Sequence, residues 1–521
     1  MGTIFVNSDA WNFWVDNDLE GLSRDGVIDA IRRDVAFYAS RGGVGAILYN
    51  MNFQRSFYPT KVGTPFWKDL SFAEDGSLLL RGKPLSDKWR EGNGGDGGFS
   101  RMFRASRHVW DVAPDFMALR YAICHEAGVG MWHSMRMDDI HHSYLGCEWL
   151  PQHADIWLDR KDLVRAWYRH TWRGEWRDNA LDYGKRDVFD YHVAMMREYV
   201  LDYESDGIEL DWMRSVPVFA PGFDEANAPI LTQFMRETRR ACAEAEAKWG
   251  HPLRVGVRVP ASAHEAFAMG MDVAAWAREG LVDLVAPSCR DTMTEQDCDM
   301  PIWRVLCPSP IIIAPDLDYA VSSDHLARFV LGFDAGIDAG FASGWYHDGA
   351  DTMYAYNHFP RHALEDHQGF PDEFAWLGDR DEVARRPRRH VFTGHRPCGE
   401  GTCFHSPYPD FVWSKCCNGG VRINCGEMTA GRKAHVVVGT CAPAALDILV
   451  NTAPCNPMPP DAPLPARLPK ARYGAEPHWL QAEIPSGVLH DGWNNIEFFN
   501  RGDKDLSAAD FAWLEVDVGQ A

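Results

Sequence analysis

Short apolar runs alternate with segments of helical periodicity up to about residue 350. Such runs suit strands that are buried on both faces, and the amphipathic segments between them suit helices that cover those strands. The alternation therefore predicts an α/β fold with parallel strands and crossover helices. The strands are predicted at 4–8, 44–50, 129–135, 207–212, 254–259, 282–286, 311–314 and 340–345, and the clearest helices at 27–40, 116–126, 188–203, 228–249, 271–278 and 323–339.

Eight strands with intervening helices predict a TIM barrel, a fold that usually takes about 250 residues or more. Two long segments interrupt the pattern, at 53–114 after the second strand and at 136–187 after the third. Both follow a strand, on the side of a barrel where substrate-binding loops lie. We therefore expect a catalytic domain at 1–380 with these two segments at its mouth.

From about residue 395 the apolar runs become shorter and are separated by Gly, Pro and Asn, which predicts a β-sandwich of jelly-roll type at 395–521. The segment 380–390 is predicted to be a charged connection, and 385–389 within it is expected to be a solvated linker rather than an anion site. The sandwich is expected to brace the barrel or to form oligomer contacts, and carbohydrate binding is the alternative. Its strands are predicted at 435–438, 446–450, 479–484, 495–499 and 511–518.

Composition narrows the choice of partner. A net charge of −22 argues against a nucleic acid or an anionic membrane as the main partner, and no apolar run reaches transmembrane length. No signal peptide is visible, so we expect a cytoplasmic protein, or a periplasmic or secreted one if a leader has been removed. The 13 cysteines form no regular framework, which favours reduced thiols over a few disulfides near the C-terminus. No cofactor is expected, and a homo-oligomer is left open.

The stretch 206–214, DGIELDWMR, carries acidic residues in a predicted strand. Alternation places Glu209 and Asp211 on one face and Ile208 and Leu210 on the other. If the apolar face packs on helices, both acids point into the middle of the fold. Acids in an interior cost free energy unless they are paired or functional, so this strand is where we look for chemistry.

The C-terminal ends of the predicted strands form a polar cup, and barrel enzymes carry their chemistry at that end. The cup is rich in carboxylates with His, Arg and Trp around them, which suits the binding of sugar hydroxyls and sugar rings. The candidate catalytic residues are Asp211, Asp291, Asp139 and Glu209. The candidate substrate-binding residues are Asp9, Trp11, Asn50, His133, Arg136, Asp138, His141, His142, Arg258, Asp316, Trp345, His347 and Asp348.

Cleavage of a glycosidic bond needs one carboxylic acid to protonate the leaving oxygen and a second carboxylate to attack or to activate water. Asp211 is the leading candidate for the carboxylate, and Glu209 lies one layer deeper, where a pair with Arg258 is expected. Asp291 and Asp139 lead as proton donors, ahead of Asp316, Asp318 and Asp348. Arg136, His141 and His142 are expected to bind substrate or to hold Asp138 and Asp139 in place.

Two other chemistries are weighed against this one. Asp138, Asp139, His141 and His142 are of types that bind zinc, but no HExxH or comparable spacing supports a metal site. Ser288 lacks the GxSxG elbow of a serine nucleophile. A metal-dependent hydrolase therefore remains only as an alternative.

Three stretches, DGIELDWMR at 206–214, MRMDDIHH at 135–142 and YAYNHF at 354–359, resemble uncharacterised bacterial proteins with a glycoside-hydrolase-like TIM barrel, grouped as glycoside hydrolase-like family 10 relatives. The resemblance covers about residues 1–360. It implies carbohydrate hydrolysis but supplies neither a substrate nor catalytic residues.

The strand at 206–213 is also similar to the chitinase-type family 18 signature, DGxDxDxE. Glu209 and Asp211 match its second and third acids, but Met213 stands where that family has its catalytic glutamate. This departure argues against substrate-assisted chemistry and keeps a non-catalytic sugar-binding scaffold open. We expect a glycosidase with paired carboxylates, exo-acting on an oligosaccharide or glycoside in a pocket that the two long segments wall.

Overall fold

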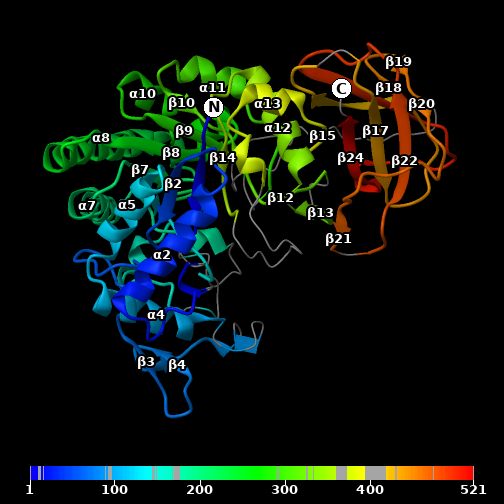
Figure 1. The fold of residues 1–521 in the computed structure, drawn as a ribbon. Coiled ribbons are helices and arrows are strands. Elements are labelled where there is room, and N and C mark those ends of the chain that lie inside the picture. Colours follow the sequence, from blue (N-terminus) through cyan, green and yellow to red (C-terminus); the bar gives the residue numbers. More distant parts are fainter. Residues whose placement is uncertain are drawn as a thin grey trace.

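The structure is a computed structural model in which a parallel sheet wrapped by helices adjoins a set of antiparallel sheets (Figure 1). Figure 1 shows the N-terminus beside the parallel sheet and the C-terminus on the antiparallel sheets. The described residues are 2–9, 13–15, 17–87, 90–91, 95, 97–143, 147, 149–166, 168, 176–289, 293–323, 327–332, 334–358, 372–393, 418–428, 431–472 and 474–519.

Nine parallel strands curl into one sheet, in the order β10-β9-β8-β7-β6-β2-β1-β14-β11. The strands at the two ends of this order, β10 and β11, are separated in the chain only by Ala314 and Pro315, so both ends of the sheet lie on one segment. The first seven predicted strands are confirmed to within about two residues. The strands are β1 (Ile4–Ser8), β2 (Val44–Asn50), β6 (Gly130–Arg136), β7 (Gly207–Asp211), β8 (Arg254–Pro260), β9 (Leu284–Ser288), β10 (Ile312–Ile313), β11 (Asp316–Leu317) and β14 (Tyr354–Ala355).

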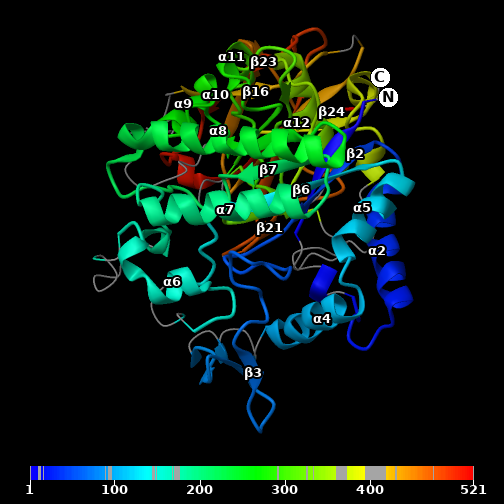
Figure 2. The same cartoon turned by 90° about the vertical axis from the view of Figure 1, so that its left-hand side faces the viewer.

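Helices cover the outer face of this sheet, as the amphipathic segments predict (Figures 1 and 2). In α2 the side chain of Ser23 caps the first turn by accepting from the Gly26 amide, and the buried Val27, Ile31 and Val35 follow at helical spacing. Five of the six predicted helices are confirmed. The outer helices are α2 (Arg24–Ala39), α5 (Phe116–Glu126), α7 (Arg186–Asp202), α8 (Asp224–Trp249), α9 (Ala263–Ala268), α10 (Val273–Arg278) and α11 (Met300–Leu306).

The eighth predicted strand, 340–345, is wrong: this segment lies inside the helix α12 (Ala335–Asp348). Asp334 caps the helix, since its side chain accepts from the amides of Gly336 and Ile337. The helix is buried on nearly all sides, so it lacks the polar face by which a helix is recognised and reads as an apolar run. The helix predicted at 323–339 is wrong as well, because 320–321 and 329–332 form the hairpin β12 (Ala320–Val321) and β13 (Phe329–Gly332).

Gly340 lets α12 lie directly on the strand β15 (Arg388–Val391), because a Cβ at this position would stand 2.2 Å from the carbonyl oxygen of Arg389. Gly340→Ala is therefore expected to lower the free energy of unfolding by about 1–3 kcal/mol through overpacking, although alanine favours helices. Urea unfolding measures the change. Gly336→Ala is the control, since its nearest neighbour is a side-chain oxygen at 3.1 Å, and an equal loss there would contradict the prediction.

The two long segments extend from the same end of the parallel sheet (Figures 1 and 2). The first carries a small antiparallel sheet and a helix, and the second carries short helices. Each segment follows the C-terminal end of a parallel strand, β2 or β6. Their elements are β3 (Leu70–Phe72), β4 (Leu78–Leu80), β5 (Lys83–Pro84) and α4 (Phe99–Val112), then α6 (Asp155–Asp159), η1 (Lys161–Leu163) and η3 (Trp176–Asn179).

Two antiparallel sheets near the C-terminus, which we call the C-terminal β unit, share one apolar core. In β23 the buried positions alternate strictly, so one face meets the other sheet and one face is more open. The five predicted strands are confirmed. The first sheet has the order β15 (Arg388–Val391), β24 (Phe511–Val518), β17 (Ala434–Thr440), β22 (His478–Ile484) and β20 (Asn456–Pro457), and the second β16 (Asn418–Asn424), β23 (Trp493–Asn500), β18 (Leu446–Val450) and β19 (Ala453–Pro454).

The β unit is joined tightly to the rest of the chain. Arg389 in β15 forms ion pairs with Glu515 at 2.8 Å and with Asp334 at 3.1 Å, and β21 (Lys470–Ala471) pairs with β13. The solvated linker predicted at 385–389 is therefore wrong at Arg388 and Arg389, which are buried in a strand. Residues 380–385 of the charged connection form the helix α13. The remaining short elements are η4 (Asp372–Ala375) and η5 (Ala508–Asp510).

The structure also bears on the expectations about membrane-spanning segments and about cysteines. Within the described ranges, no helix is both long enough and apolar enough to cross a membrane. Among the described residues, the following cysteines are free thiols, in agreement with the expectation of reduced cysteines at these positions: Cys124, Cys242, Cys289, Cys298, Cys307, Cys425 and Cys455.

Candidate active site

The inside of the curled sheet is apolar at one end and polar at the other. At the apolar end, Trp132 packs with Leu48, Leu284 and Tyr354. Its indole fits because Gly207 faces it, where a Cβ would stand 2.5 Å from the ring. The outward residues of β7 belong to the main core, so alternation turns the other face of this strand toward the inside, as predicted.

Glu209 lies in the middle of this interior, fully buried and held by three donors. Its Oε2 accepts from Asn7 Nδ2 at 3.1 Å and from Ser134 Oγ at 2.6 Å, and the Tyr354 hydroxyl donates to Oε1. Burial, followed by the charge of Asp211, raises the pKa of Glu209 to about 7. The hydrogen bonds from Ser134 and Tyr354 oppose this rise. Glu209 is thus enclosed below the open end of the sheet.

Arg258 bridges two carboxylates in the layer above Glu209, nearer to the C-terminal ends of the strands. Its Nη1 donates to Asp211 Oδ1 at 3.2 Å, and its Nε and Nη2 donate to Asp316 Oδ2 at 3.2 and 3.0 Å. The predicted Glu209–Arg258 pair is wrong, because the register of β7 and β8 sets Arg258 beside Asp211 and Gly256 beside Glu209. The guanidinium also lies 3.7 Å from the centre of the Tyr356 ring, which stabilises the cation from its face.

Asp318 stands one inward position beyond Asp316, and burial raises the pKa of both carboxyls. Its Oδ1 accepts from the Tyr319 amide at 2.7 Å, whereas its buried Oδ2 has no hydrogen-bond partner among the described residues. Burial and the neighbouring charge of Asp316 raise the pKa of Asp318 to about 8. The raised pKa favours the protonated carboxyl, which is the form that can donate a proton, while Arg258 and hydrogen bonds from the Tyr319 amide and the Asn357 side chain act in the opposite direction.

A second charged cluster lies across the same end of the sheet. Arg136 donates through Nη2 to Asp9 Oδ2 at 2.7 Å and through Nη1 to Asp139 Oδ2 at 3.0 Å. The Asn50 amide fits best with its oxygen toward Arg136 Nε, at 3.2 Å. Four predicted site residues, from β1, β2, β6 and the turn after β6, thus meet around one guanidinium.

His141 and Arg214 complete this cluster. The Nδ1 of His141 lies 2.8 Å from Asp139 Oδ1, and Arg214 Nη2 contacts the other ring nitrogen, Nε2. Burial lowers the pKa of His141, so the ring is neutral, with a proton on Nδ1 for Asp139 and a lone pair on Nε2 for Arg214. Burial alone would raise the pKa of Asp139, but His141, Arg136 and Arg214 hold it well below the ordinary range. A carboxyl in this state does not suit a proton donor.

Several predicted residues lie elsewhere. His133 points outward, toward the Tyr203 carbonyl at 3.3 Å, because Ser134 and Arg136 take the inward positions of β6. Asp138 accepts from the Leu181 amide of the second long segment at 3.4 Å. His142 follows His141 in the turn, with a left-handed φ of 56°. Trp11 and Asp291 lie outside the described residues.

Trp345, His347 and Asp348 are also removed from the polar end of the sheet, because α12 replaces the expected strand. Trp345 is buried and donates to the Gln296 carbonyl at 3.4 Å. Asp348 accepts from Asn424 at 2.7 Å and from Trp493 at 3.2 Å, both in the β unit. Their placement at the end of an eighth strand is wrong, because the segment is helical.

Sequence reasoning left out several residues of the site: Asn7, Ser134, Arg214, Tyr354 and Tyr356. Alternation along β1 and β6 identifies Asn7 and Ser134, but the last strand, β14, has only two residues and gives no period by which the two tyrosines could be found. Arg214 lies beyond the end of β7, where no periodicity applies. Asp318 was weighed only behind Asp291 and Asp139.

Asp139 and His141 are of residue types that bind metal ions, but both are engaged in contacts with other side chains. In the part of the chain that the structure describes, no group of three or more His, Cys, Asp or Glu side chains is arranged to hold a metal ion. Asp139 and His141 bind each other and two arginines. This arrangement disfavours the zinc alternative at 138–142.

Comparison with known proteins gives no family model and no curated protein that matches. Among solved structures, a chitinase from Chromobacterium violaceum is 12% identical, with a TM-score of 0.35 over 74% of this chain and 100% of that one. An alpha-amylase from Lactobacillus plantarum is 11% identical, with a TM-score of 0.37 over 92% and 98%.

The chain also matches a Paenibacillus cycloisomaltooligosaccharide glucanotransferase at 8% identity, with a TM-score of 0.32 over 99% of this chain. It spans 57% of the length of that enzyme. These three matches have identities of 8 to 12% and TM-scores below 0.4.

Proposed function

We propose that the protein is a glycoside hydrolase, with Asp318 as the proton donor and Asp211 as the second carboxylate. The catalytic unit is an eight-stranded barrel that closes through the segment 312–317, and the β unit is of jelly-roll type. The pairing of β10 with β9 and of β11 with β14 supports closure, because the segment that carries both strands then forms one side of the ring.

The observation that carries the proposal is the contrast between these two acids. Glycosidases need one protonated and one ionised carboxyl near the same bond, and environments that set two acids apart supply this. Asp318 has an unpartnered oxygen and a raised pKa, whereas Asp211 forms an ion pair with Arg258. Both residues occupy the C-terminal ends of barrel strands, where barrel enzymes work.

Glu209 is assigned a positioning role in this proposal. Asn7, Ser134 and Tyr354 occupy its oxygens, and it lies below Asp211 on the same strand, so substrate does not reach it. Its carboxyl orders three side chains of the barrel interior beneath the reacting groups. Glu209 therefore takes no direct part in bond cleavage in this proposal, in contrast to the hypothesis drawn from the sequence.

Substrate binding is assigned to the second cluster. Arg136 and Asp139 are fixed by each other, which presents Asp9, His141 and Arg214 around the mouth with little freedom to move. Fixed polar groups of this kind bind sugar hydroxyls at a low cost in conformational entropy. The two long segments stand at this end, which favours an enclosed pocket and exo-action on an oligosaccharide or glycoside.

A sugar-binding scaffold without activity is the second candidate. Met213, buried beyond the end of β7, occupies the position of a catalytic glutamate in the similar family 18 strand, and Arg258 already holds Asp211. In this alternative, both carboxyls would accept hydrogen bonds from sugar hydroxyls. The two proposals differ in turnover and agree in binding.

A panel of p-nitrophenyl glycosides and oligosaccharides tests the proposal. Wild type is expected to release aglycone or reducing sugar from at least one of them, and Asp211→Asn is expected to lower kcat at least about 100-fold. Asp206→Asn is the matched control, since Asp206 precedes the same strand at its opposite end and binds the Met131 amide there. Oligosaccharide binding by calorimetry without turnover anywhere on the panel would favour the scaffold.

A further inference from the structure

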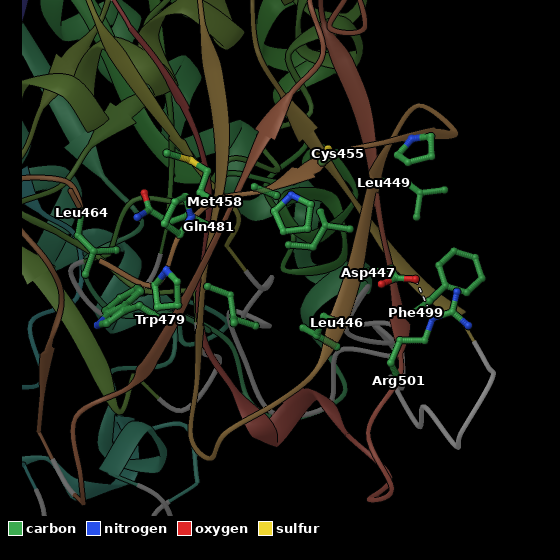
Figure 3. Close-up of a pocket in the computed structure, with 17 residues that line it drawn as sticks. Leu446, Asp447, Leu449, Cys455, Met458, Leu464, Trp479, Gln481, Phe499 and Arg501 are labelled. Atoms are coloured by element: carbon green, nitrogen blue, oxygen red, sulfur yellow. Dashed lines mark hydrogen bonds and ion pairs between the residues drawn. The ribbon is translucent and has the colours of Figure 1, made fainter. Parts of the chain in front are cut away.

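The β unit contains a solvent-accessible cavity of about 540 Å³ between its two sheets. The chain crosses from one sheet to the other at this edge: β19 pairs with β18, β20 pairs with β22, and only Cys455 separates β19 from β20. Figure 3 shows Trp479 and Leu464 on one side of the space and Phe499 and Arg501 on the other. The volume falls within the range of about 300–1,000 Å³ that ligand sites occupy.

The walls of this cavity are mainly apolar. Leucine, isoleucine and methionine side chains, Trp479 and Phe499 line it together with four prolines, which carry no N–H donor. Water in such a space finds few partners, so an apolar group that displaces it gains free energy. The cavity therefore suits an apolar body, aliphatic or aromatic.

Polar side chains are few and lie at the rim. Gln481 Nε2 donates to the Ala462 carbonyl at 3.2 Å, and Asp447 accepts from Arg501 Nε at 2.7 Å. A sugar would leave most of its hydroxyls without partners here, which costs free energy for each one buried. These walls therefore disfavour the carbohydrate role considered for the C-terminal sandwich, at least in this cavity.

Arg501 places a positive charge at the edge of the cavity. It uses Nε for Asp447, and its two terminal nitrogens have no partner among the described residues, at a side-chain exposure of 58%. We propose that the cavity binds a small amphipathic molecule, with its apolar body between the sheets and a single anionic head, a carboxylate or sulfonate, on the outer edge of Arg501. This site lies in the β unit and does not depend on the proposed glycosidase activity.

Titration of the full chain with anilinonaphthalene sulfonate tests the proposal, because this probe has an aromatic body and one anionic head. Wild type is expected to show saturable binding with enhanced fluorescence. Leu446→Trp, which fills the cavity from its lining, is expected to weaken that binding at least about tenfold. Leu489→Trp is the matched control, a partly buried leucine of the same apolar core that does not line the cavity.

Arg501→Gln tests the head without changing the cavity. It is expected to weaken the sulfonate probe about three- to fivefold, as for an exposed charge, and to leave the neutral N-phenylnaphthylamine unchanged. Arg422→Gln, an exposed arginine on β16, is expected to leave both probes unchanged. Asp318→Asn is expected to bind both probes like wild type, which separates this site from the barrel.

Two results would overturn the inference. If Leu446→Trp and Arg501→Gln both bind the probe like wild type, the cavity is not its site. If neutral oligosaccharides displace the probe from wild type but not from Leu446→Trp, the occupant is a sugar and the assigned ligand class is wrong.

Discussion

Asp318→Asn is expected to lower kcat by about 10³-fold for a glycoside with a poor leaving group, the usual contribution of a positioned general acid. Asparagine has the same shape and cannot donate the proton. The loss should shrink for 2,4-dinitrophenyl glycosides, whose leaving group needs little protonation. Steady-state kinetics over aryl glycosides of graded leaving-group acidity measures the dependence.

Asp138→Asn is the matched control for this change. Asp138 is also a buried acid with a raised pKa and an unpartnered oxygen, but it faces the second long segment. Its variant is expected to keep kcat within about threefold, because it lies away from the reacting groups. A loss in Asp318→Asn that is equal for all leaving groups would transfer the donor role to another acid.

The pH profile gives an independent reading of the same group. Asp318 donates only while protonated, so kcat/KM is expected to fall as pH rises through about 8, the raised pKa of its carboxyl. The free energy of unfolding is expected to fall with rising pH as well. In the unfolded chain the carboxyl releases its proton near its ordinary pKa, whereas the folded protein keeps the proton up to about pH 8. The stability that the buried neutral acid contributes is therefore lost as pH rises through the folded pKa. Asp318→Asn should remove this dependence and be no less stable at pH 7.

Arg258→Met is expected to lower the free energy of unfolding by about 3–5 kcal/mol, because removal of one partner leaves buried charges uncompensated. The variant would expose Asp211 and Asp316 to each other inside the barrel without their shared cation. Guanidinium unfolding at pH 7 measures the loss. Adding Asp316→Asn is expected to restore part of it, since one of the two charges is then absent.

Arg236→Met is the control for this second prediction. Arg236 pairs with Glu279 at 2.7 Å on the surface, where both side chains are more than a third exposed, so the expected change is at most about 1 kcal/mol. Equal losses in the two variants would mean that Arg258 contributes no more than a surface ion pair. Part of the interior would then be hydrated.

Local periodicity in the sequence was enough to predict the strands that carry the site and the inward direction of its acids on β7. Alternation along β7 placed Glu209 and Asp211 inward, and the apolar runs located seven strands. The partner of Arg258 could not be found in this way, because it depends on the register between β7 and β8. A shift of two residues would have set Arg258 beside Glu209 instead.

The last strand shows a different limit. β14 has only two residues, Tyr354 and Ala355, too few for a period to be read, while the buried helix α12 presents a longer apolar run nearby. Arg214 reaches the site from a position beyond the end of β7, where contacts distant in sequence decide the conformation. Those contacts are set by the whole fold and leave no local signal.

The pairing of β1 with β14 has a consequence for biosynthesis. Phe5 lies beside Tyr354 in the sheet, and Thr352 Oγ1 donates to the Thr3 carbonyl across 349 positions of chain. At about 5–20 residues per second, a ribosome needs roughly 20–70 s to supply that partner. Throughout this interval one edge of the first strand is unpaired, so the nascent chain presents an edge to which other chains can add. Yield of folded protein should therefore depend on chaperone supply and on the rate of elongation.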